Sequence, residues 1–228
     1  ADAEPYFRQA LTLYQDIPGT ERDQAACLYI LATTLHDLGQ PADAEPYFRQ
    51  ALTLYQDIPG TERDQAACLY ILATTLHDLG QPADAEPYFR QALTLYQTLP
   101  GTEQIQANCL YNLATTLHDL GQLANAEPYY HQALTLYQTI PNTQRSQAAC
   151  LHNLATTLRE LGKPADAEPY YHQALNLLQD IPNTEEQQAT CLGNLADTLF
   201  LLGQLADAEP YYHQALPLYQ TIPGTERE

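Results

Sequence analysis

The chain has 228 residues and a formal net charge of −19, from 28 acidic against 9 basic side chains. Nucleic acids and anionic membranes are bound mainly through Lys and Arg, so this charge argues against both as partners. Valine is absent, and no apolar run approaches the ~20 residues that span a bilayer. Because strands favour β-branched residues, we expect an all-α protein with no membrane span.

A unit of 41 residues recurs along the chain, and residues 1–41 repeat letter for letter as residues 42–82. The units start at residues 1, 42, 83, 124, 165 and 206, and the last is incomplete. Such a period indicates stacked supersecondary units, each packed on its neighbours. We predict a single array over residues 1–228. We also expect it to be a fragment of a longer protein, because the chain has no Met and begins inside a unit.

Each unit encodes two helices. In residues 107–120, the apolar residues Leu110, Leu113, Ala114 and Leu117 have the spacing of one helical face. Gly121 is expected to end this first helix, called A. A second stripe over residues 126–137 predicts helix B, which closes near residue 140, before a Pro. The chain starts and ends on a B helix, so eleven helices are predicted, six B and five A.

The joints between helix B and the next helix A carry turn residues. Most read Ile-Pro-Gly-Thr or Ile-Pro-Asn-Thr, and the Gly or Asn is expected to adopt the left-handed conformation. The Thr is predicted to N-cap helix A. Thr20 with Asp23, and Thr184 with Gln187, have the spacing of a capping box.

A Pro also lies near the start of each B helix. We expect it within the first turn, where it is tolerated, so that the second copy's helix begins around Asp43 and includes Pro46 early. A slight kink is the alternative. Pro217 lies well inside the last B helix, which is therefore expected to be frayed, bent or short.

Five Cys occur at one position of the repeat, spaced by 41 residues. They are Cys27, Cys68, Cys109, Cys150 and Cys191. Equivalent positions in stacked helices should lie roughly 10 Å apart, too far for a disulfide. We interpret these residues as small buried thiols, which favours a reducing compartment and a cytoplasmic location.

The unit resembles a tetratricopeptide repeat (TPR). Leu110, Leu113, Leu117, Gly121 and the Ala and Tyr residues of helix B fall at the spacings of that family's packing signature. The usual repeat has 34 residues, whereas this unit looks like the longer repeats of kinesin light chains and of many bacterial array proteins. The resemblance implies a right-handed α-solenoid, a superhelix of antiparallel helix pairs, and it implies binding rather than one particular function.

The resemblance also implies that the A helices line a concave groove that binds an extended peptide or a partner protein. The register places four rows of residues there. The candidate groove residues are Tyr70, Tyr111, Asn112, Thr115, His118, His152, Asn153, Thr156, Arg159, Asn194 and Asp197.

The Asn residues of this set, Asn112, Asn153 and Asn194, are the sharpest candidates, because family members hold a peptide backbone with side-chain amides. The alternative is that Asn is only a tolerated solvated residue at this position. The first two copies carry Ile30 and Ile71 there. An acidic peptide could dock near the basic residues of the fourth copy, although such residues are more often a solvated face.

No catalytic or metal-binding pattern emerges from the sequence. The chain has a single Ser, Ser146, and no Gly-rich phosphate loop, and its His and acidic residues are periodic rather than clustered. We therefore predict no enzyme activity, no cofactor and no metal. The alternative function is a self-associating structural array, through uncapped ends or exchanged helices, in a fragment suited to studies of repeat folding.

Overall fold

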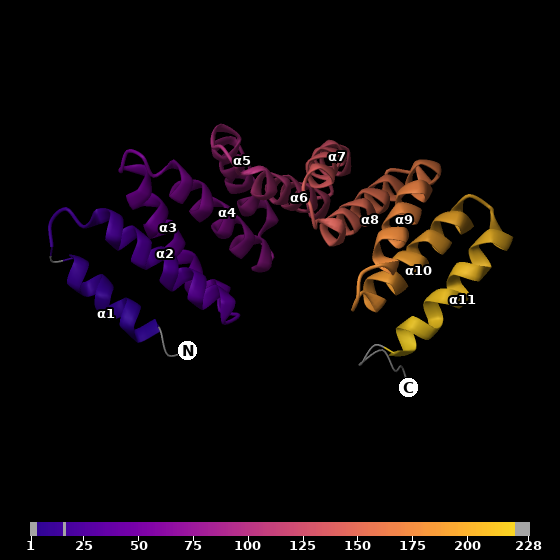
Figure 1. The fold of residues 1–228 in the computed structure, drawn as a ribbon, viewed down its shortest axis with the longest axis horizontal. Coiled ribbons are helices and arrows are strands. Elements are labelled where there is room, and N and C mark those ends of the chain that lie inside the picture. The colour runs from indigo at the N-terminus through magenta and orange to yellow at the C-terminus, as the bar shows by residue number, and fades with distance from the viewer. Residues whose placement is uncertain (1–3, 16, 222–228) are drawn as a thin grey trace. The chain divides into compact units, whose positions relative to one another are not determined.

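The structure is a computed structural model that describes residues 4–15 and 17–221. Residues 1–3, 16 and 222–228, which include both ends of the predicted array, lie outside the described residues. Within this described part the chain forms eleven helices and no strand, as predicted (Figure 1). The helices are α1 (Glu4–Gln15), α2 (Glu21–Asp37), α3 (Pro41–Gln56), α4 (Glu62–Asp78), α5 (Pro82–Thr98), α6 (Glu103–Asp119), α7 (Leu123–Thr139), α8 (Gln144–Glu160), α9 (Pro164–Gln179), α10 (Glu185–Leu201) and α11 (Leu205–Thr221).

The helices form two compact units, residues 1–120 and 121–228. In each unit, helices adjacent in sequence pack against one another. Even-numbered helices are the A helices and odd-numbered helices are the B helices. Because each unit is compact by itself, the single array over residues 1–228 stays a prediction.

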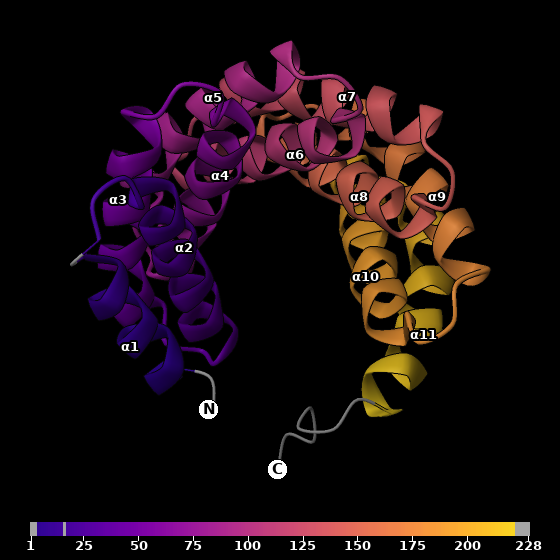
Figure 2. The same cartoon turned by 60° about the vertical axis from the view of Figure 1, so that its left-hand side comes forward.

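The A helices of one unit lie side by side. Contacts join α2 to α4 and α4 to α6 in the first unit, and α8 to α10 in the second. Figure 2 shows α2, α4 and α6 on one side of the first unit and α1, α3 and α5 on the other. We call the side formed by the A helices the A face of each unit.

Small and branched apolar residues explain this packing. On α6, Ala107, Leu113, Ala114 and Leu117 are fully buried, at the i, i+3 and i+4 spacing read from the sequence. The Ala residues let neighbouring backbones approach closely, and the Leu residues fill the space between them. The same positions of α4 and α8 are also buried, so the same packing recurs in each copy.

Left-handed residues make the turns, as predicted. Gly80 follows α4 with φ 71°, and the next amide, of Gln81, donates to the carbonyl of Leu76, which satisfies a terminal carbonyl of the helix. Asn142 and Asn183 have φ of 61° and 57° in the turns before α8 and α10. Asn tolerates this conformation better than other residues with a side chain.

The predicted Thr caps are correct in position but wrong in chemistry. Thr61 is the N-cap of α4, yet its side chain makes no capping hydrogen bond to that helix. Instead its buried hydroxyl donates backwards to the carbonyl of Tyr55, at 2.6 Å, and Nε2 of Gln65 donates to that carbonyl and to the Thr oxygen. The hydroxyl thus ties the end of helix B to the start of helix A.

The capping boxes predicted for Thr20 and Thr184 do not form, for the same reason. Each Thr hydroxyl donates to the end of the preceding helix, and its side-chain partner is the Gln four residues later, Gln24 or Gln188. Asp23 and Gln187 therefore do not serve as capping partners of these Thr residues.

The Pro residues of the B helices lie deeper than expected. Helix α3 begins at Pro41 rather than around Asp43, because Pro41 itself suits the first helical position. Pro46 is then the sixth helical residue, beyond the first turn, and one intrahelical hydrogen bond is missing there. Helix α11 has 17 residues, as many as α5 and α7, so Pro217 does not shorten it.

The five Cys are free and buried, as predicted. The thiol of Cys68 donates to the carbonyl of Phe48 on the neighbouring B helix, at 3.2 Å. Burial raises the pKa of the Cys68 thiol to about 12, so it stays protonated and unreactive at neutral pH.

Candidate functional site

The candidate site lies on the A faces, where neighbouring helices bring predicted residues together. In the first unit, Nδ2 of Asn112 donates to the hydroxyl of Tyr70, at 3.0 Å. In the second unit, Nδ2 of Asn194 lies 3.3 Å from Nε2 of His152. In both pairs the partners are 42 residues apart, so an Asn meets the aromatic ring of the preceding copy.

The amide of Asn194 can be oriented from its neighbours. Arg159 is a donor only, and its guanidinium donates to Oδ1 of Asn194, at 3.3 Å. The amide nitrogen therefore faces His152, whose Nε2 accepts the hydrogen bond. Asp197 completes this group, with its carboxylate 3.8 Å from Arg159. Four predicted residues of α8 and α10 thus form one polar cluster.

The aromatic rings of the A face are anchored on the B helices. Tyr70 packs edge to face on Phe89, with ring centroids 6.0 Å apart, and His152 packs likewise on Tyr171, at 5.6 Å. Burial raises the pKa of Tyr70 to about 12, so its hydroxyl remains protonated. These ring contacts orient Tyr70 and His152 on the A face.

The remaining predicted residues are half-buried on the same helices. The hydroxyl of Thr115 donates to the carbonyl of Tyr111, and that of Thr156 to the carbonyl of His152, so these hydrogens are used within the helix. Asn153 and His118 are likewise half-buried. The oxygen of Thr156 also lies 2.9 Å from the hydroxyl of Tyr171 on α9.

The His and Asp residues pair between copies, which the sequence did not indicate. Nε2 of His77 lies 2.8 Å from the carboxylate of Asp119, and His36 lies 3.0 Å from Asp78. Each His therefore meets the Asp that lies 42 residues later. These pairs join neighbouring A helices near their C-terminal ends.

The basic residues of the fourth copy do not form one cluster. Arg145 donates to the carbonyl of Pro182, at 3.0 Å, whereas Lys163 lies 2.9 Å from Glu127. Arg159 is held by the group on α10 described above. Because each cation has a separate partner, these residues offer no concentrated positive surface for an acidic peptide.

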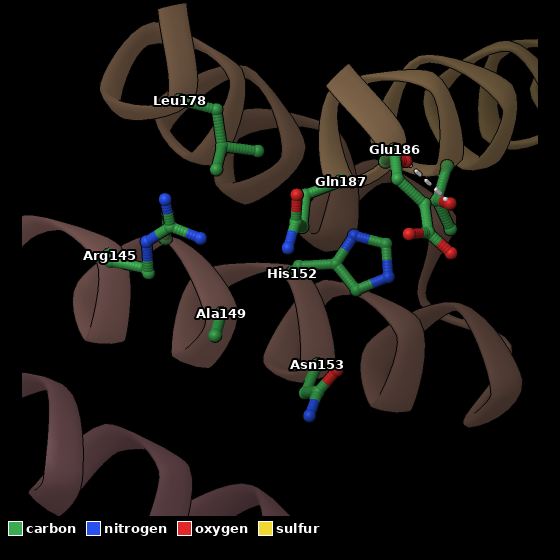
Figure 3. Close-up of a pocket in the computed structure, with 9 residues that line it drawn as sticks. Arg145, Ala149, His152, Asn153, Leu178, Glu186 and Gln187 are labelled. Atoms are coloured by element: carbon green, nitrogen blue, oxygen red, sulfur yellow. Dashed lines mark hydrogen bonds between the residues drawn. The ribbon is translucent and has the colours of Figure 1, made fainter. Parts of the chain in front are cut away.

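A cavity of about 370 Å³ opens on the A face of the second unit, between α8 and α10 (Figure 3). It is lined by Arg145, Ala148, Ala149, His152, Asn153, Leu178, Glu186, Gln187 and Thr190. Figure 3 shows the His152 ring between Gln187 and Glu186, while the side chain of Asn153 turns away. Of the cavity residues, sequence analysis had selected only His152 and Asn153 as groove candidates.

His152 is neutral at physiological pH. Burial and, to a smaller extent, the charge of Arg159 together lower its pKa to about 4. Because Nε2 accepts from Asn194, the neutral ring carries its hydrogen on Nδ1. The cavity thus contains a neutral ring donor beside the cationic Arg145.

The described residues include no group of three or more His, Cys, Asp or Glu side chains arranged to hold a metal ion. Among them there is also no helix with the length and apolar character needed to cross a membrane. The contacts described on the A faces are hydrogen bonds, ion pairs and ring contacts.

Stacked antiparallel helix pairs with a polar face on one helix of each pair define an all-α repeat protein of the α-solenoid class. The chain belongs to the tetratricopeptide-repeat family, whose model matches residues 1–57, 24–98, 64–139, 106–180 and 146–221. Members of this family generally act as non-catalytic scaffolds that bind proteins or peptides. No curated protein matched the chain.

Solved structures share the fold. The crystal structure of BtubC (BKLC) from P. vanneervenii is 20% identical, with a TM-score of 0.79 over 100% of this chain and 92% of that one. The nearly identical TPR-like repeats assigned to a kinesin light chain of Podospora anserina are 18% identical, with a TM-score of 0.72 over 89% of this chain and 97% of that one. The MamA protein is 15% identical, with a TM-score of 0.67 over 89% and 93% of the two chains. At these identities the likeness concerns the fold alone.

Proposed function

We propose that the A faces bind an extended peptide segment of a partner protein, without catalysis. The observation that carries this proposal is the polar lining of these faces. Half-buried amides, rings and hydroxyls are held in place by contacts between neighbouring helices, as in the pairs of Asn112 with Tyr70 and Asn194 with His152. Such preorganised groups lose little conformational freedom on binding.

The amides suit a peptide backbone. An Asn side chain offers two donor hydrogens and an acceptor oxygen, and the bond from Asn112 to Tyr70 uses one of these hydrogens. The remaining capacity matches the alternating donors and acceptors of an extended chain. The net charge of −19 favours a basic or neutral peptide, since an acidic one would be repelled.

Selection of peptides from a display library against the full chain tests this function. Binding of the selected peptides is then compared between the chain and variants with Asn112→Ala, Asn153→Ala and Asn194→Ala, made singly and together. We expect the triple variant to bind at least about tenfold more weakly, as for loss of hydrogen bonds of roughly 1 kcal/mol each. Thr53, Thr94 and Thr135 lie exposed on B helices, and their Ala variants serve as the matched control. Unaltered binding by the Asn variants, or loss by the Thr variants, would contradict the proposal.

A second candidate function is end-to-end self-association. On α11, Leu205 is 58% exposed and Leu216 is 56% exposed, and on α1 Leu13 is 61% exposed. These apolar residues lie on helices whose equivalents in the other copies pack against a further A helix, so a second copy of the chain could cover them. Light scattering over a dilution series tests this function. A mass that rises with concentration and returns to the monomer value in Leu205→Glu and Leu216→Glu variants supports it, and a constant monomer mass excludes it.

A further inference from the structure

The cavity of the second unit lies where the repeat loses one aromatic residue. In five copies the position near the end of helix B is Tyr, namely Tyr14, Tyr55, Tyr96, Tyr137 and Tyr219. In the fifth copy this position is Leu178, which lines the cavity. Leu178 is 4% exposed, as is Tyr55, so the backbone places both side chains on the same buried side of helix B.

The surroundings of Tyr55 show what the cavity lacks. The pKa of Tyr55 is raised to about 12, mainly by burial and also by the neighbouring Asp64, Cys68 and Tyr29, while Arg22 acts against them. The Tyr55 phenol therefore lies near Arg22, Tyr29 and Asp64. The positions 123 residues later, three repeats on, are Arg145, His152 and Gln187, and all three line the cavity.

The third copy gives the same result. Burial raises the pKa of Tyr96, with contributions from the neighbouring Tyr70 and an opposing one from Arg63. Tyr70 and Arg63 occupy the repeat positions of His152 and Arg145. In two other copies, the phenol ring of a Tyr thus occupies the space that is open beside Leu178.

We propose that this cavity is a binding site for a phenol ring supplied by a ligand. The ring would pack on Leu178 and the Ala residues of α8, and its hydroxyl would meet Arg145, His152 and Gln187. The volume of about 370 Å³ is ample, since a closed apolar cavity of about 150 Å³ already binds benzene.

The polar residues suit a hydroxyl better than a bare ring. His152 carries its hydrogen on Nδ1, Gln187 has an amide that both donates and accepts, and Arg145 only donates. A phenol oxygen can accept from the first and the last of these and donate to the amide. A ring without the hydroxyl would cover the Nδ1 hydrogen of His152 without offering it an acceptor.

Two sources could supply the phenol: a free small molecule, or the Tyr side chain of a bound peptide. The second source rests on the proposed peptide-binding function and the first does not. The test therefore uses two matched pairs of ligands: p-cresol with toluene, and N-acetyl-tyrosine amide with N-acetyl-phenylalanine amide. Each is titrated into the full chain, and binding is followed by ligand-observed NMR and calorimetry.

We expect one p-cresol to bind per chain, at least about tenfold more tightly than toluene, as for one satisfied polar group. Leu178→Tyr restores the residue of the other copies, should fold normally, and is expected to lose p-cresol binding. Tyr96→Leu opens the equivalent space between α4 and α6 and is expected to add a second p-cresol per chain. Circular dichroism checks the fold of both variants.

Unchanged p-cresol binding in Leu178→Tyr, or no binding to the unaltered chain, would overturn the proposal. If p-cresol binds and the Tyr amide does not, the site takes a free phenol. If the Tyr amide also binds more tightly than the Phe amide, the site takes a Tyr side chain. Loss of peptide binding with p-cresol binding intact would refute the proposed function alone.

Discussion

The A face between α4 and α6 and the A face between α8 and α10 are built on the same repeat but present different chemistry. In the first region, the hydroxyl of Tyr70 accepts a hydrogen bond from Asn112. The buried Tyr96 fills the space beside Tyr70. In the second, His152 replaces the first Tyr and Leu178 replaces the other, which leaves a cavity of about 370 Å³.

The Leu residues between the A helices stay constant while positions beside the A face differ between the two regions. Leu72 and Leu154, at the same repeat position, are both fully buried. One of the substitutions that distinguish the regions, Tyr70 against His152, lies on the A face, and the other, Tyr96 against Leu178, lies at a buried position of helix B beside it. A repeat array can thus keep one set of interfaces between helices while each copy acquires its own binding chemistry.

The largest expected effect tests the shared core. We expect Leu72→Ala and Leu154→Ala each to lower the free energy of unfolding by about 2–5 kcal/mol, because each removes a buried side chain and leaves a cavity. Urea unfolding followed by circular dichroism measures both. A loss below about 1 kcal/mol for one of them would show that the two cores differ.

The second effect concerns His152 and pH. Its pKa is about 4 in the folded chain against 6.5 when unfolded, so the unfolded state binds more protons between these values. Stability is therefore expected to fall as pH drops from 6.5 toward 4, by up to about 3 kcal/mol from this residue. The His152→Tyr variant, which has the Tyr of the earlier copies at this position, should lack this pH-dependent loss of stability. Urea unfolding of both proteins at pH values from 7 to 4 measures the difference. Parallel pH profiles would refute a buried neutral His.

The third effect tests the joint between helices. Thr61→Val and Thr184→Val each remove a buried hydroxyl that donates to a carbonyl of the preceding helix, and each is expected to cost about 1–2 kcal/mol. The exposed Thr53→Val, whose hydroxyl bonds only within its own helix, should stay within about 0.5 kcal/mol. Equal losses for all three variants in thermal unfolding would contradict this assignment.

The smallest effect separates the copies that carry Asn from those that carry Ile. A double-mutant cycle of Tyr70→Phe with Asn112→Ala is expected to give a coupling of about 0.5–1.5 kcal/mol from their hydrogen bond. Tyr29 with Ile71 occupies the same pair of positions one copy earlier and serves as the control. A coupling as large in the control cycle would mean that packing, not the amide, joins the rows.

The repeat itself made most of the fold predictable. The period, the apolar stripes and the turn residues gave eleven helices, the left-handed Gly and Asn positions and the buried Cys. The capping chemistry was wrong, because spacing within one helix cannot show that Thr61 bonds to the end of the preceding helix, next to Gln65.

The candidate site was predicted only in part. Equivalent positions identified the rows of the A face, but not the offset of 42 residues that pairs Asn112 with Tyr70 or His77 with Asp119. That offset depends on how neighbouring helices are shifted along their axes. The cavity was missed although a signal existed, since Leu178 interrupts an otherwise complete column of Tyr residues.

The central claim is that ligands bind on the A face, and photocrosslinking tests it most directly. A benzophenone side chain is placed at one of two exposed positions. The first is Thr190 on α10, which lines the cavity, and the second is Thr135 on the B helix α7. We predict that a selected peptide crosslinks from position 190 and not from position 135. Crosslinking from position 135 alone would contradict the account.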